Sequence, residues 1–165
     1  MSINRAAFIG SAVLSSLLCG AALSFGAHRQ HGATECTIIS GPAAATKAGS
    51  IVAGSGGATI ECGLGDDDLF QHGDVTRLFF SGYDSATNAQ VVVQACSRPW
   101  VNATGFVCGT QWLSGVSFTG TFNAGTGVDL SAWTQHRGDA SYVHVELTGV
   151  NNGRGGAWHG FYVEK

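Results

Sequence analysis

The sequence predicts an all-β protein, and within that class an antiparallel β-sandwich of the jelly-roll or immunoglobulin-like type. Short runs alternate apolar and polar residues, which is typical of strands with one buried face. Clusters of Gly, Asn, Ser and Asp separate these runs, as turns do. Helix signals are scarce, because 25 glycines in 165 residues would weaken a helix almost anywhere. A closed barrel is the alternative architecture.

The amino-terminal segment predicts export. One basic residue, Arg5, precedes an apolar stretch that ends in small residues near Gly26. This order is typical of a secretory signal peptide, here over residues 1–26, and an uncleaved membrane anchor is the alternative. After cleavage we expect a flexible arm over residues 27–35 and a single sandwich domain over residues 36–165. The mature protein is then expected to be secreted or periplasmic, without a membrane segment.

Several short runs in this domain are expected to be strands. The clearest is 141–149, where Val143, Val145 and Leu147 should face the core. The runs 75–82 and 88–96 are more continuously apolar, as central strands are. The other predicted strands are 37–40, 50–54, 58–62, 105–112, 114–122 and 157–164.

Four of the five cysteines lie beyond the signal segment: Cys36, Cys62, Cys96 and Cys108. An even number of cysteines in an exported chain predicts disulfides. We expect the pairs Cys36–Cys62 and Cys96–Cys108, because each closes a short local loop. A zinc site is the alternative, but the close C-x2-C spacing typical of such sites is missing.

The stretch "GLGDDDLFQHGDV", residues 63–75, concentrates carboxylates in a chain that is poor in charge. The first interpretation is a capped helical turn that begins at Asp67 and ends at Gly73. The second is a calcium site, since hard cations prefer several oxygen ligands. Its expected ligands are Asp66, Asp68 and Asp74.

A third interpretation of this stretch pairs Asp74 with His72 for catalysis. It lacks a nucleophile, because the chain contains neither a G-x-S-x-G nor an H-E-x-x-H motif. All four cysteines of the mature chain are expected to be disulfide-bonded, so a cysteine nucleophile is not expected either.

The last two predicted strands resemble a hairpin with one aromatic, polar face. Tyr142, His144 and Glu146 should point outward from the first strand. On the second strand the alternation is less clear, and the inward set is either Trp158, Tyr162 and Glu164 or His159, Phe161 and Val163. We expect the second set, because Phe161 and Val163 are the more purely apolar pair. Trp158, Tyr162 and Glu164 would then join the outward residues of the first strand. We expect Tyr142, His144, Glu146, Trp158 and Tyr162 to contact a ligand, and packing beneath loops is the alternative role for the rings.

The composition narrows the choice of partner. The formal net charge is −3, and there is no basic run, which argues against nucleic acid and anionic membranes. The first hypothesis is an exported, non-catalytic binding module with a polysaccharide as its ligand. Alternatives are a small secreted hydrolase or lyase that uses His144 and Glu146, and a structural subunit of a surface assembly. Calcium, at the acidic stretch, is the candidate cofactor.

Overall fold

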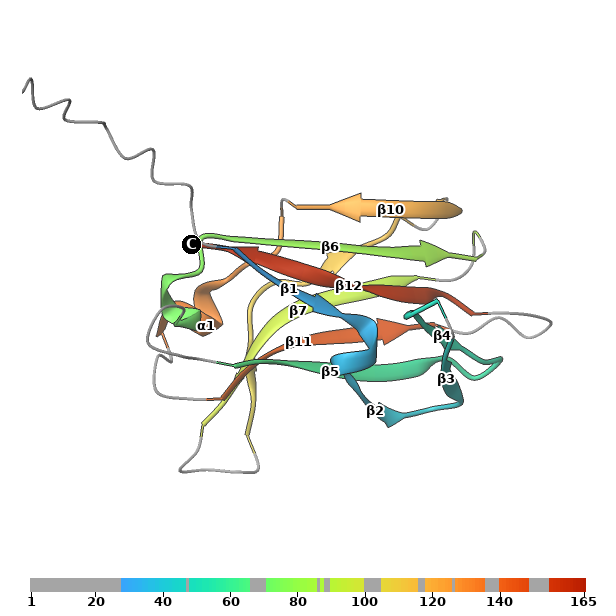
Figure 1. The fold of residues 1–165 in the computed structure, drawn as a ribbon, viewed down its shortest axis with the longest axis horizontal. Coiled ribbons are helices and arrows are strands. Elements are labelled where there is room, and N and C mark those ends of the chain that lie inside the picture. Colours follow the sequence, from blue (N-terminus) through green and yellow to red (C-terminus); the bar gives the residue numbers. More distant parts are fainter. Residues whose placement is uncertain are drawn as a thin grey trace, which may run out of the picture.

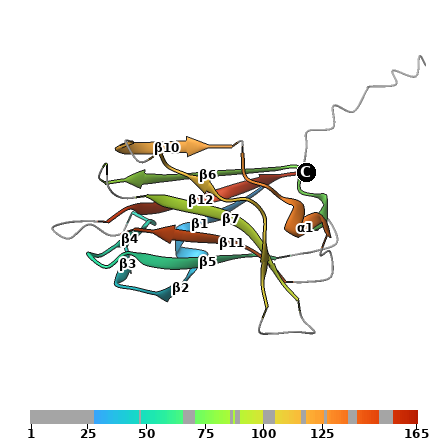
Figure 2. The ribbon, with the colours of Figure 1, turned by 180° about the vertical axis from the view of Figure 1, so that it is seen from behind.

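The computed structural model describes residues 28–46, 48–65, 71–85, 87, 90–99, 105–115, 118–125, 127–135, 140–148 and 155–165. These residues form two antiparallel sheets that pack together as a sandwich (Figure 1). The reverse view shows the same two overlapping layers (Figure 2). The predicted β-sandwich is confirmed.

The first sheet is built around β12 (Ala157–Glu164), which pairs with β6 (Arg77–Asp84) along one edge. Strand β10 (Gly120–Ala124) lies beyond β6 and ends the sheet on that side. Along its other edge, β12 pairs with β1 (His28–Gly32) and with β4 (Ile51–Ala53). Strand β3 (Ala43–Ala45) follows β4.

The second sheet has β11 (Ala140–Leu147) at its centre, between β5 (Ala58–Leu64) and β7 (Val91–Arg98). Strand β2 (Thr37–Ser40) pairs with the outer edge of β5. The outer edge of β7 pairs with two short strands, β8 (Val107–Cys108) and β9 (Trp112–Leu113).

Three short helices complete the described fold. They are η1 (Ala33–Glu35), η2 (His72–Asp74) and α1 (Ser131–Gln135). Helix α1 lies at the end of the sandwich where β12 ends (Figure 1). The Trp133 side chain is fully buried, and its Nε1–H donates to the Cys96 carbonyl at 2.9 Å. This contact attaches the helix to β7 of the second sheet.

The core lies between the inward rows of the two sheets. On β11, Val143, Val145 and Leu147 are buried, as their alternation predicts. They belong to one apolar cluster with Phe161 and Val163 of β12 in the opposite sheet. Burial of these rows is the main favourable term in folding.

Both predicted disulfides are present, Cys36–Cys62 and Cys96–Cys108. Cys96 and Cys108 are direct partners in the pairing of β7 with β8. Cys36 immediately precedes β2, which pairs with β5, the strand that carries Cys62. Each disulfide therefore joins neighbouring strands of the second sheet.

Within the segment expected to be an amino-terminal arm, 27–35, the described residues form β1 and η1. The segment has no aliphatic alternation, and two other kinds of contact fix it on the sheet. The His31 ring stacks on the Phe161 ring, with centroids 4.7 Å apart, and the main chain of β1 pairs with β12. The signal peptide predicted over residues 1–26 lies outside the described residues.

The predicted hairpin of the last two strands is wrong. Strands β11 and β12 lie in different sheets, so their outward faces point to opposite sides of the sandwich. Residues 148–156 connect the two strands, and a connection of this length does not fix a hairpin register as a tight two-residue turn does. Strand β12 instead inserts between β6 on one side and β1 and β4 on the other.

The expected orientation of two residues on β12 is also wrong. The register between β12 and β6 shifts between Trp158 and Gly160, which marks a β-bulge. The bulge interrupts the alternation, so Trp158 is fully buried with Phe161, and His159 is exposed.

Candidate ligand-binding groove

The candidate site lies on the outward face of the first sheet. Strand pairing arranges side chains there in rows that cross the sheet. One row contains Gln30, Tyr162 and Phe79. The adjacent row contains Gly32, Gly160, Ser81 and Asn123.

The first row is aromatic. The Phe79 and Tyr162 rings stack with centroids 4.5 Å apart and planes 7° from parallel. Both side chains are half-buried. Gly125 packs against Phe79 so closely that a Cβ at this position would overlap the ring. The pair is therefore held in place from the β10 side while part of it stays in contact with solvent.

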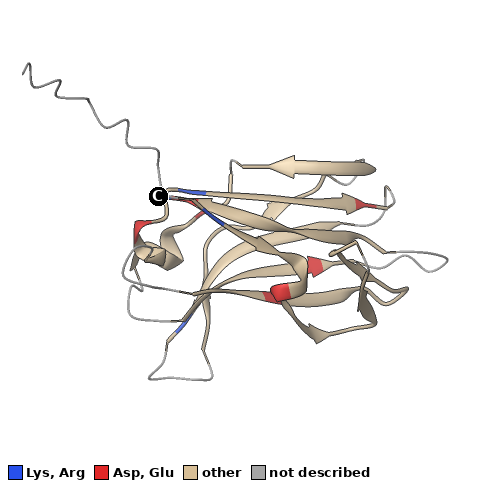
Figure 3. Ribbon diagram, in the orientation of Figure 1, with Lys and Arg blue, Asp and Glu red and all other residues tan. Residues whose placement is uncertain are grey.

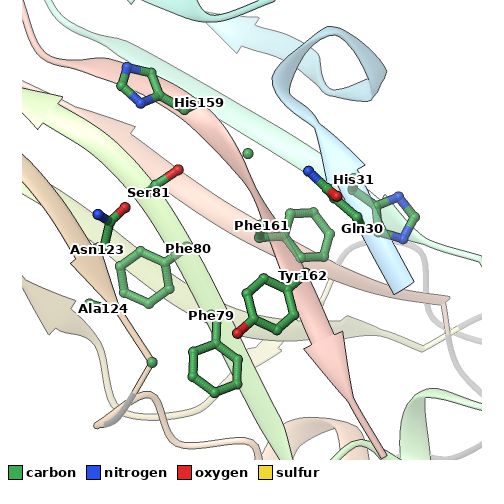
Figure 4. A pocket seen from close by; sticks show the side chains of 12 residues that line it. Gln30, His31, Phe79, Phe80, Ser81, Asn123, Ala124, His159, Phe161 and Tyr162 are labelled. Carbon is green, nitrogen blue, oxygen red and sulfur yellow. The ribbon is translucent and has the colours of Figure 1, made fainter. Parts of the chain in front are cut away.

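The second row is low, meaning that its side chains rise little above the sheet, because its central residues are small. Gly160 adopts φ +128°, a conformation that favours glycine, and a Cβ there would overlap the His31 carbonyl oxygen. Its cross-strand partner is Ser81. A groove of about 400 Å³ forms above these residues (Figure 4). This volume falls within the range of small-molecule sites.

Polar side chains surround the groove on three strands. Gln30 comes from β1, Asn123 from β10 and His159 from the bulge of β12, and all three are exposed. Figure 4 shows them around the opening, with Ser81 between Asn123 and His159. Amide, hydroxyl and neutral imidazole groups each both donate and accept hydrogen bonds. The described lining residues include no carboxylate, and charged residues are sparse on the sheets (Figure 3).

A packed aromatic layer supports the groove from below. Phe80 and Phe161 line its base and are almost fully buried. The Phe80 ring lies edge-on to Trp112 with centroids 4.9 Å apart, and His31 stacks on Phe161. The Nδ1 atom of His31 lies 2.9 Å from Oε2 of Glu35. These contacts fix the strands that carry the rim residues.

The outward face of the second sheet is different in kind. Nε2 of His144 lies 3.3 Å from Oε1 of Glu146, and Nδ1 lies 4.0 Å from Oε1 of Glu61. Nη2 of Arg98 donates to both carboxylate oxygens of Glu61 at 3.3 Å. The polar groups on this face therefore bind one another.

Tyr142 belongs to the same charged face, but it is only 6% exposed. The Arg98 guanidinium lies over its ring, with Cζ 5.3 Å from the centroid. Burial raises the pKa of the Tyr142 phenol, and the negative charge of Glu61 adds to the rise. The protonated phenol is thus the form that this environment favours.

The five residues expected to contact a ligand are distributed over three places. Tyr162 lines the groove. Trp158 lies in the core with its Nε1 buried and without a hydrogen-bond partner among the described residues. Tyr142, His144 and Glu146 lie on the opposite sheet. The role of His144 and Glu146 in a hydrolase or lyase stays a prediction.

The acidic stretch is described only in part. Asp66 and Asp68, two of the three expected calcium ligands, lie outside the described residues. Asp74 lies in η2, where its Oδ2 is 3.8 Å from Nζ of Lys165. Within the described ranges, no three His, Cys, Asp or Glu side chains come close enough to hold a metal ion. The calcium site stays a prediction.

Sequence reasoning missed most of the groove. The alternation in "RLFFSGY" places Phe79 and Ser81 on one face of a strand, and this signal was available. Gln30, Asn123 and His159 carried no comparable signal, because each joins the site only through strand pairing or through the bulge.

The described residues thus define an antiparallel β-sandwich with an aromatic groove on one sheet, and the described lining contains no carboxylate, Lys or Arg. No family model and no curated protein matches the chain. Comparison with solved structures finds carbohydrate-binding modules and a carbohydrate esterase, all at low sequence identity.

One of these structures is a family two carbohydrate esterase from Cellvibrio japonicus, with a TM-score of 0.45 and 12% identity over 84% of this chain. The match spans only 34% of the esterase chain. A second is the low-affinity xylan-binding module CBM86 from Roseburia intestinalis, with a TM-score of 0.41 and 11% identity over 85% of this chain and 96% of the module.

A third is the family 11 carbohydrate-binding module from Clostridium thermocellum, in complex with a β-1,3-1,4-mixed-linked tetrasaccharide. Its TM-score is 0.36, with 12% identity over 82% of this chain and 87% of that module. With TM-scores below 0.5 and identities of 11–12%, these likenesses carry no argument about the present chain.

Proposed function

We propose that the protein is an exported, non-catalytic β-sandwich module that binds a neutral polysaccharide in the groove of the first sheet. The observation that carries this proposal is the partly exposed Phe79–Tyr162 stack beside a groove of about 400 Å³ with a neutral polar rim. The proposed site keeps Tyr162 from the residues expected to contact a ligand and adds Phe79, Gln30, Ser81, Asn123 and His159.

The chemistry of a sugar matches these groups. A pyranose ring presents C–H patches that pack on aromatic rings. Its hydroxyl groups both donate and accept hydrogen bonds, as do the Gln30 and Asn123 amides. The described rim offers no Lys or Arg to pair with a carboxylate on the ligand. Neutral saccharides are therefore the expected class.

Export is part of the same proposal. Two disulfides form and persist mainly in oxidising compartments. None of the described helices has the length and apolar character needed to cross a membrane. A module outside the cell or in the periplasm would have access to polysaccharides.

Affinity electrophoresis and calorimetry against soluble polysaccharides test the proposal. The neutral panel is xylan, mixed-linkage β-glucan, galactomannan and starch, and polygalacturonate is the anionic comparison. We expect retention by at least one neutral polymer. Replacing Tyr162 by Ala should weaken that binding about tenfold or more, because one aromatic contact is worth about 1 kcal/mol beyond its buried area.

The matched control is Phe106→Ala, which removes an aromatic ring that is 65% exposed next to β8 of the other sheet. It should bind as the wild type does. Failure of the wild type to bind every neutral polymer would overturn the proposal. An equal loss of affinity in Tyr162→Ala and Phe106→Ala would reject the groove as the site.

A further inference from the structure

Resting on the proposed function, we infer that the binding surface continues from the groove along β6 to Tyr83. The ligand would then be an internal stretch of a linear polysaccharide that lies along this strand, rather than a single terminal sugar. Three features support this extension: the outward residues of β6, the small size of the residues beside Tyr83, and the bulge in β12.

The outward residues of β6 follow one another in a simple order. Arg77 is followed by Phe79, Ser81 and Tyr83, each two positions further along the same face. Tyr83 is 41% exposed. Its cross-strand partners are Ala157 on β12 and Thr121 on β10. The neighbours of Tyr83 across the sheet are therefore small on both sides, and its ring is partly exposed.

The spacing suits a chain. Tyr83 lies four positions beyond Phe79, which in an extended strand is a distance of about 13 Å. The low row that contains Ser81 and Gly160 lies between the two rings. A ligand that contacts both rings must therefore cross the groove from one end to the other, which one sugar residue bound against Tyr162 does not do.

The opposite end of β6 explains why the ligand would extend from the groove toward Tyr83 and not toward Arg77. Beyond Phe79, Nη1 of Arg77 lies 3.5 Å from Oε2 of Glu164, so the next row is an ion pair. The Arg77 and Glu164 side chains already bind each other, and this row offers no aromatic ring on which a sugar could pack. Extension toward Tyr83 meets an aromatic ring instead.

The β-bulge gives His159 a place in this arrangement. The bulge falls between Trp158, which faces Gly82, and Gly160, which faces Ser81. His159 therefore projects from β12 between the groove and the Tyr83 end, and it is exposed. Bulges often reorient a side chain at a functional site. Here the imidazole is placed to bind hydroxyl groups midway along the chain.

Calorimetry with oligosaccharides of two lengths tests the inference. The probes are cellobiose and cellohexaose, xylobiose and xylohexaose, and mannobiose and mannohexaose. We expect the wild type to bind one hexasaccharide more tightly than its disaccharide. Tyr83→Ala should lower affinity for that hexasaccharide about tenfold and leave the disaccharide unchanged. Tyr162→Ala should weaken both, and Phe106→Ala should weaken neither.

A Tyr83→Ala variant that binds the hexasaccharide as the wild type does would overturn the inference and leave the proposed function intact. Equal losses for both lengths would also overturn it, because Tyr83 would then act on the groove itself. The proposed function fails separately, if the wild type binds no saccharide or if Tyr162→Ala has no effect. Thermal unfolding of each variant confirms that the compared proteins are folded.

Discussion

The two outward faces of this sandwich differ in whether their polar side chains already have partners. On the second sheet, polar contacts of 3.3 to 4.0 Å join Arg98, Glu61, His144 and Glu146, so these side chains already have partners. On the first sheet, small residues open a groove beside Tyr162, and the polar side chains of its rim are exposed. A face whose polar groups already bind one another gains little from a ligand, whereas an open rim gains hydrogen bonds.

The largest effect expected from a single substitution concerns Trp158, which belongs to neither face. Its side chain is fully buried and lies against Phe80 with ring centroids 5.9 Å apart. Trp158→Ala should therefore lower the free energy of unfolding by about 3–5 kcal/mol, measured by urea denaturation. Trp158→Phe should cost less, because it keeps a ring and removes an indole N–H that has no partner in the described structure.

Binding by the folded Trp158→Phe protein separates the core from the site. We expect its affinity for the retained polysaccharide to match the wild type, since Trp158 faces away from the groove. If the variant kept normal stability but lost affinity, Trp158 would have to contact the ligand, as the alternation of the sequence alone predicts.

Trp158 also shows how much of the structure could be predicted from the sequence. Alternation located β11 and its inward valines, and cysteine spacing indicated both disulfides, because these depend on neighbours in the chain. Strand β12 also alternates, but the bulge at His159 reverses the orientation of Trp158. A bulge depends on the register with β6, and nothing in residues 157–164 alone encodes that register.

The sheet that β12 joins could not be predicted from the sequence, for a similar reason. Residues 148–156 can return the chain beside β11 or cross to the other layer, and only packing of the whole domain decides between them. Strand β1 escaped prediction because it pairs through its main chain and through the His31 ring, without the aliphatic residues that mark a strand. The groove could not be predicted either, because it is assembled from β1, β6, β10 and β12, and neither β1 nor the sheet of β12 was predicted.

A comparison of two glycines sharpens the contrast between the faces. Gly160 forms the low row of the groove with φ +128°, and an added Cβ would overlap the main chain of β1. Gly63 lies on the other outward face, in β5, where an added Cβ would meet nothing within 4 Å. Gly160→Ala should lower the free energy of unfolding by about 1–3 kcal/mol. Gly63→Ala should change it by less than about 0.5 kcal/mol.

Urea denaturation of the two alanine variants measures this difference. The substitutions are chemically identical, so a difference between them reports the local backbone and the position of β1. Equal effects would show that β1 does not pack closely on Gly160, and the base of the groove would have to be redrawn.

The smallest effect is a pH dependence that belongs to the second face. Burial and the Glu61 carboxylate raise the pKa of Tyr142 above its ordinary value of about 10. The folded state therefore holds the phenol proton more tightly than the unfolded chain does. The resulting stability is fully present below the unfolded pKa of about 10 and is lost as the pH rises through the folded pKa.

Tyr142→Phe removes this titration and should flatten the alkaline fall in stability relative to the wild type. The check is the free energy of unfolding of both proteins at pH 8 and above pH 10, with the difference between the two pH values as the readout. Tyr162→Phe is the matched control, because it removes a tyrosine hydroxyl from the groove on the other face. If Tyr162→Phe flattened the curve and Tyr142→Phe did not, the contrast between a charged, closed face and a neutral, open one would be wrong.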